Sequence, residues 1–115
     1  MNIEEFKDFV NKHSVNQTDF FKMTALCGEV GELANVIKKA EFYNMFETYQ
    51  EKVEKEIQAG IRKTWQEQFI DEAGDVLFYY IQLLEHWNVS IEEVIEYQKN
   101  KILQQDLDCG RTFKK

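Results

Sequence analysis

Two short acidic motifs, far apart in the chain, hold its best candidates for chemistry. The first pairs Glu29 with Glu32, and the second pairs Glu72 with Asp75. Residues three positions apart share one face of a helix, about 4.5 Å apart along the axis at ~1.5 Å per residue. Two such helices packed face to face would bring four carboxylates together. Their mutual repulsion is relieved by cations, and hard oxygen ligands suit Mg²⁺ or Mn²⁺.

Three interpretations of these carboxylates remain open. In the first, the acids pair with Lys or Arg across a helical bundle or simply lie at its solvent-exposed edge. In the second they form a di-iron centre, and in the third they hold Mg²⁺ that binds a nucleoside triphosphate. A di-iron carboxylate bundle requires Glu-x-x-His pairs, and the two histidines, His13 and His86, lie at neither motif. In the third interpretation the cation neutralises the phosphates and activates the attacking water.

The elements that must position these acids are helices. The chain has no Pro, five Gly and 30 % charged residues, which favours long helices over a turn-rich β fold. We therefore predict an all-α, four-helix-type bundle. The hydrophobic spacing predicts helices over residues 2–13, 19–40 and 61–88, a short helix ending at Gly60 after an aromatic turn, and a last helix from Ser90 to about Gln105.

Local signals support these boundaries. Thr18 or Asp19 is a suitable N-cap for the second helix, and Ser90 with Glu93 forms a capping box. Asn88 and Val89 form the turn before that box. Each acidic motif also contains a glycine in mid-helix, Gly31 and Gly74, which costs ~1 kcal/mol relative to Ala. The two glycines indicate close backbone approach or a crowded site.

The organisation predicted for the chain is one bundle domain over residues 1–105 and a polar tail over residues 106–115. Segment 76–84 is apolar almost all round, which is typical of a helix buried on two sides and favours a homodimer or tetramer. The net charge of −7 argues against a nucleic acid polymer as partner.

The compartment predicted for the chain is the cytoplasm. The longest apolar run, residues 76–81, is too short to span a membrane, and the first residues do not form a signal peptide. The two cysteines, Cys27 and Cys109, lie in no metal or disulfide motif and indicate reduced thiols. We therefore expect no membrane partner.

Residues 25–34 (ALCGEVGELA) and 71–77 (DEAGDVL) resemble the all-α nucleotide pyrophosphohydrolases of the MazG and dimeric-dUTPase kind. The signature of that superfamily is Glu-x-x-Glu, an insert, then Glu-x-x-Asp, and residues 88–94 resemble the turn that opens its last helix. The resemblance covers roughly residues 18–105. It implies that water attacks the α-phosphorus of a nucleoside triphosphate, often a non-standard or deoxy one, giving the monophosphate and pyrophosphate. It also implies a Mg²⁺ site, with Mn²⁺ as a substitute, formed by Glu29, Glu32, Glu72 and Asp75.

The chain departs from the family pattern in its basic residues. Members often carry an Asn, a Lys and an Arg on the last helix that face the phosphates. The matching positions here are Gln98, Lys101 and Gln105, so only Lys101 is kept. Lys39, on the same side of its helix as Glu32, is a second candidate for the phosphates or else a solvated lysine. The reduced basic set leaves open a non-catalytic helical interaction module that kept the fold.

Two further departures concern the base and the insert. Some members carry an extra acid before the first Glu, where this chain has Gly28, so the identity of the general base stays open. The 39 residues between Glu32 and Glu72 form a long insert with an aromatic cluster. Trp65, on the helical arc of Glu72, is the candidate to stack on the nucleobase, although aromatic stripes more often belong to a core.

Overall fold

The computed structural model describes residues 1–14 and 17–110. Within these ranges the chain forms five helices and no strand, which confirms the all-α prediction. In chain order the helices are α1 (Ile3–His13), α2 (Asp19–Asn44), α3 (Glu47–Gln58), α4 (Trp65–His86) and α5 (Ile91–Asp108).

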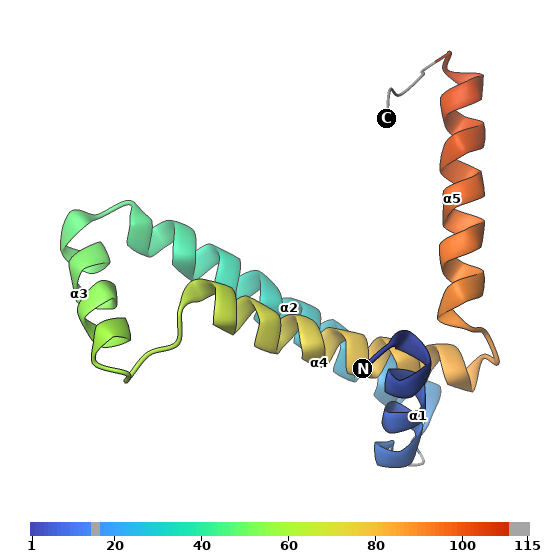
Figure 1. Ribbon diagram of the computed structural model, residues 1–115, viewed down its shortest axis with the longest axis horizontal. Coiled ribbons are helices and arrows are strands. Elements are labelled where there is room, and N and C mark those ends of the chain that lie inside the picture. The colour runs from blue at the N-terminus through green and yellow to red at the C-terminus, as the bar shows by residue number, and fades with distance from the viewer. Residues whose placement is uncertain (15–16, 111–115) are drawn as a thin grey trace.

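The two long helices, α2 and α4, lie side by side in opposite directions and form the hairpin on which the rest of the chain is arranged (Figure 1). Helix α3 closes one end of the hairpin, and α1 packs on α4 at the other. There, His86 Nε2 at the end of α4 lies 2.9 Å from Asp19 Oδ1 at the start of α2. This arrangement places the mid-points of α2 and α4 opposite each other.

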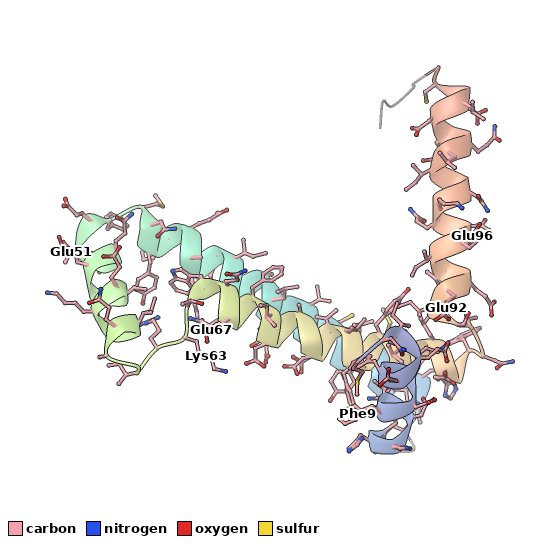
Figure 2. All side chains as sticks on the ribbon, in the orientation of Figure 1. Phe9, Glu51, Lys63, Glu67, Glu92 and Glu96 are labelled. Carbon is pink, nitrogen blue, oxygen red and sulfur yellow. The ribbon has the colours of Figure 1, made fainter. Side chains whose placement is uncertain are left out.

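Helix α5 projects away from the hairpin (Figure 1). Its start is tied to α1 by an ion pair of 3.1 Å between Lys7 Nζ and Glu92 Oε2. Beyond this point most of its side chains extend into open space (Figure 2), although Asp106 near its end is buried. Large apolar side chains are among them, and Ile95, Leu103 and Leu107 are each more than half exposed.

Most predicted helix starts and turns are found in the structure. Thr18 caps α2 by accepting from the Phe21 N–H (3.2 Å), and Ser90 with Glu93 forms the expected capping box at α5. Gly60 follows α3 with a φ of 75°, a left-handed conformation suited to glycine. Asn88 turns the chain between α4 and α5 with a φ of 55°.

Three predicted boundaries were wrong. Helix α2 continues through the aromatic residues to Asn44 rather than ending near residue 40. Helix α4 begins at Trp65 rather than residue 61, because Thr64 and Glu67 form a capping box there, with the Glu67 N–H 3.0 Å from Thr64 Oγ1. Helix α5 continues to Asp108, so it includes the first three residues of the predicted tail. Residues 15–16 of the predicted loop and residues 111–115 of the tail lie outside the described residues.

Few apolar side chains of the described residues are buried. Among the described residues, the buried hydrophobic side chains are Val10, Val53 and Ile81. The close backbone approach expected at Gly31 and Gly74 is not found within the chain, because a Cβ at either position would meet nothing within 4 Å. Cys27 and Cys109 are exposed free thiols. None of the described helices combines the length and the apolar character needed to cross a bilayer.

Candidate metal centre

The antiparallel pairing of α2 and α4 brings the two acidic motifs together. Glu29 and Glu32 lie on α2, and Glu72 and Asp75 lie opposite them on α4. One carboxylate oxygen from each residue can be chosen so that all four atoms lie within 4.8 Å of one another. The i, i+3 spacing places both acids of a motif on the helix face that meets the partner helix.

The four acids differ in burial. Glu29 and Glu72 are half-buried between the helices, whereas Glu32 and Asp75 are exposed. Oε2 of Glu29 and Oε2 of Glu72 are buried and have no hydrogen-bond partner among the described residues. A buried carboxylate oxygen without a partner is unfavourable, and a bound cation would satisfy both atoms.

The cluster also raises the pKa of its inner members. Burial is the main cause of the raised pKa of the Glu29 carboxyl, followed by the negative charges of Glu32 and Asp75. Burial likewise raises the pKa of Glu72, followed by the effect of the adjacent Glu32 carboxyl and its negative charge. Both shifts have the sign expected where like charges are crowded in a partly dry site.

The structure shows no ion pairing of the acids across the bundle in the described part of the chain. None of the four acids forms an ion pair there with Lys or Arg. Nor does the cluster contain a histidine: His13 bonds to the Phe9 carbonyl and His86 pairs with Asp19. This donor set is unlike a di-iron centre.

The residues present fit a hard divalent cation. The donor set consists of four carboxylates, which is the ligand chemistry of Mg²⁺ and Mn²⁺. The two buried, unpartnered oxygens would become satisfied, and a cation would remove the repulsion that raises the pKa values of Glu29 and Glu72.

Comparison with protein families identifies the relatives of this chain. The model of the MazG nucleotide pyrophosphohydrolase domain matches residues 17–109, which includes α2 through α5 and all four acids. The chain belongs to this family. It is accordingly a nucleotide pyrophosphohydrolase, a hydrolase that acts on acid anhydrides. Comparisons with curated proteins and with solved structures gave no significant match.

The other residues predicted for the MazG site lie outside the acidic cluster. Lys39 is exposed on α2, two turns beyond Glu32 and on the same face. Trp65, the first residue of α4, lines a cavity at the closed end of the hairpin. Lys101 lies on α5, with Tyr97 and Asn100 beside it. Neither lysine forms an ion pair with any of the four acids in the described ranges.

Sequence reasoning overlooked one feature beside Trp65. The Arg62 guanidinium lies over the rings of both Tyr43 and Trp65, 5.6 and 5.8 Å from their centroids. Glu56 Oε2 holds this guanidinium at 2.9 Å. The sequence signal for this contact was a single arginine placed between Gly60 and Trp65, close enough to pack on the aromatic ring at the start of α4.

Proposed function

We propose that this chain is a Mg²⁺-dependent nucleoside triphosphate pyrophosphohydrolase that cleaves between the α- and β-phosphates. Water attacks the α-phosphorus, the bond to the bridging oxygen breaks, and the products are the nucleoside monophosphate and pyrophosphate. The observation that carries the proposal is the convergence of four carboxylates with two buried, unpartnered oxygens. Family membership supports the same reaction.

The four acids would hold Mg²⁺, or Mn²⁺ in its place. When bound, the cation neutralises phosphate charge and polarises the reacting phosphoryl group. Glu29 and Glu72, being half-buried, fix the inner side of the site. Glu32 and Asp75 are exposed and face the side from which a substrate approaches.

Two residues along the hairpin would contact the rest of the substrate. Lys39 shares a helix face with Glu32 and would meet the phosphates that extend from the cluster. Trp65 shares a face with Glu72 and offers a ring on which a base can stack. The family resemblance supports a nucleoside triphosphate as the substrate, often one with a non-standard base or a deoxyribose sugar. The free thiols of Cys27 and Cys109 accord with a cytoplasmic enzyme.

The dimensions of the chain support self-association. Its accessible surface is 9078 Å², whereas a compact monomer of 13.8 kDa exposes only ~6,600 Å². Its radius of gyration is 18.9 Å, against about 13 Å for a compact domain of this length. The excess of roughly 2,400 Å² per chain is the amount that a second copy would cover in a large, permanent interface.

The position of the exposed apolar residues indicates how a second copy would pack. Met23, Val30 and Ile37 recur every seven residues on α2 and are 46–48 % exposed. Ile70 and Leu77 form a matching exposed stripe on α4. Because α2 and α4 run antiparallel, the two stripes lie on the side of the hairpin away from Glu32 and Asp75. Two hairpins joined along this hydrophobic side would form a four-helix bundle.

Helix α5 gives a second reason to expect a partner. In its own chain this helix extends away from the hairpin (Figure 1), and within the described residues its apolar side chains Ile95, Leu103 and Leu107 stay more than half exposed. A second copy could cover them. We propose that such packing brings Lys101 to the phosphates at a neighbouring site. The proposed assembly is a homodimer or tetramer.

The proposal is tested by a panel of canonical and damaged nucleoside triphosphates assayed with Mg²⁺, with pyrophosphate and orthophosphate followed separately. We expect pyrophosphate from one or a few nucleotides and its loss on addition of EDTA. Glu32→Gln should abolish turnover without unfolding the chain. Glu41→Gln, an exposed acid on the same helix outside the cluster, is the matched control. Silence across the panel with both Mg²⁺ and Mn²⁺ would refute the proposal.

A further inference from the structure

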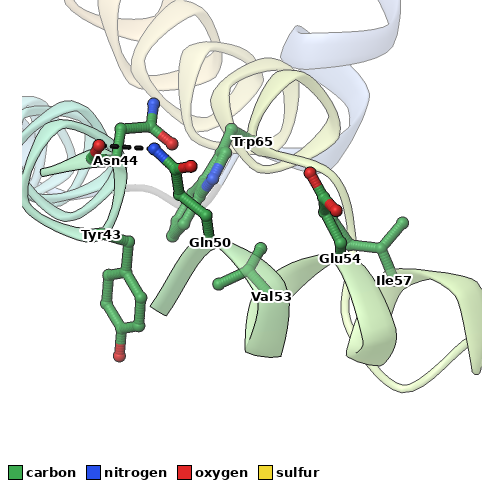
Figure 3. A pocket seen from close by; sticks show the side chains of 7 residues that line it. All are labelled: Tyr43, Asn44, Gln50, Val53, Glu54, Ile57 and Trp65. Carbon is green, nitrogen blue, oxygen red and sulfur yellow. Dashed lines mark hydrogen bonds between the residues drawn. The ribbon is translucent and has the colours of Figure 1, made fainter. Parts of the chain in front are cut away.

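A cavity at the closed end of the hairpin lies where the ends of α2 and α4 meet α3 (Figure 3). Its volume is about 310 Å³, which is within the range of small-molecule sites. Three segments supply its walls, and the lining residues are Tyr43, Asn44, Gln50, Val53, Glu54, Ile57 and Trp65.

The cavity is aligned with the acidic cluster along the hairpin. Trp65 precedes Glu72 by two helical turns, which places it on the same face of α4 and ~10 Å away along the axis. Tyr43 follows Glu32 by three turns on the matching face of α2, ~16 Å away. A nucleotide whose phosphates lie at the acids could therefore extend along the hairpin and place its base at this cavity.

The walls suit a flat aromatic ring. The rings of Tyr43 and Trp65 lie 5.8 Å apart at an interplanar angle of 49°. Arg62 covers both rings and is itself held by Glu56, so the ring pair is fixed in place. Buried Val53 completes an apolar floor. A preorganised aromatic pair beside an apolar surface is a common platform for a nucleobase.

The polar groups of the cavity favour one kind of base. One of the two N–H donors of the Gln50 side-chain amide is engaged by the Asn44 carbonyl (Figure 3). The Glu54 carboxylate lines the same cavity, and in the described ranges no ion pair or hydrogen bond occupies it. An ionised carboxylate only accepts hydrogen bonds, so it selects a ligand edge that consists of donors.

Among the common bases, guanine meets this requirement best. Its edge presents two adjacent donors, the ring N–H and the 2-amino group, which a single carboxylate can accept together. Adenine and cytosine place a ring-nitrogen acceptor beside their amino donor, and that acceptor would face the carboxylate. Uracil and thymine place one N–H between two carbonyl oxygens. We infer that the cavity is the base subsite and that Glu54 selects nucleotides with a guanine-type edge.

This inference rests on the proposed hydrolysis at the acidic cluster, but base binding can be measured without hydrolysis. Guanosine monophosphate and inosine monophosphate differ only in the 2-amino group, so calorimetric titration of both in the presence of Mg²⁺ isolates the proposed contact. We expect the guanosine nucleotide to bind about tenfold more tightly, the value of one hydrogen bond to a charged group. Glu54→Gln should remove this difference.

Glu51→Gln is the matched control, because Glu51 lies on the same helix but does not line the cavity (Figure 2). This variant should keep the preference, and circular dichroism should show that both variants retain their helix content. Equal binding of the two monophosphates, no binding of either, or an unchanged preference in Glu54→Gln would each overturn the inference. If the preference for guanosine monophosphate is found but no triphosphate yields pyrophosphate, the base subsite stands and the proposed reaction fails. If pyrophosphate is released but guanosine and inosine monophosphates bind equally, the proposed reaction stands and the base subsite fails.

Discussion

Replacing Ile37 by Asp tests whether a second copy covers the hydrophobic side of the hairpin. Ile37 is 46 % exposed in the single chain, so nearly half of its surface is available to a second copy. The accessible surface of the chain exceeds that of a compact monomer by roughly 2,400 Å². If a second copy covers this excess, a pair of chains buries ~4,800 Å², at the upper end of the range for permanent interfaces. An unpaired charge buried in such an interface costs at least ~3 kcal/mol, which is more than a hundredfold in the dissociation constant.

The assay is sedimentation equilibrium of the wild-type and variant chains over a wide concentration range. We expect the wild type to stay at two or more times the chain mass of 13.8 kDa, and Ile37→Asp to dissociate on dilution. Asn35→Asp is the control, because it introduces the same charge at an exposed position on α2 off the apolar stripe. A wild-type chain that sediments as a monomer at all concentrations would refute the reasoning, and so would a variant that stays as tightly associated as its control.

Three further predictions concern the site and the helix ends. Asp75→Asn should lower kcat/KM by more than the ~10–100-fold typical of an indirect metal partner, measured as pyrophosphate release. Without metal, the free energy of unfolding should fall as pH rises through the raised pKa values of Glu29 and Glu72, because the folded state binds these protons more tightly than the unfolded state does. Thermal unfolding in a pH series should show this fall, and added Mg²⁺ should reverse it. Thr64→Ala should lower the unfolding free energy by ~1 kcal/mol, and the melting temperature by several degrees, while Thr64→Ser should not.

The sequence allowed the convergence of the acids to be predicted because two independent spacings agree. Each acidic pair at i, i+3 lies beside an apolar stripe of the same helix, so packing the stripes together also brings the acids together. Capping residues at Thr18 and Ser90 placed two helix starts within a residue. These features depend on local spacing, and local spacing is what a single sequence records well.

The errors arose where local signals competed. Phe42 and Tyr43 were read as a turn, but aromatic residues also continue a helix when they pack against a neighbour, as Tyr43 does against Trp65. The start of α4 was placed four residues early although Thr64 and Glu67 have capping-box spacing. The cavity beside Trp65 could not be predicted, since it depends on how α3 folds back over the hairpin.

The position of α5 shows a different limit. Its apolar residues predict that the helix is covered, but periodicity cannot say by which chain. The same question arises at Gly31 and Gly74, whose expected close contacts are absent within one chain. Gly74 lies on α4 between Ile70 and Leu77, along the exposed stripe, where a second hairpin could approach the backbone closely. An acidic cluster that repels itself needs a rigid frame, and a hairpin that buries few apolar side chains among the described residues would gain that frame by joining a second copy. On this argument, assembly and catalysis depend on the same two helices, so Ile37→Asp should lose activity as it dissociates while its four acids remain intact.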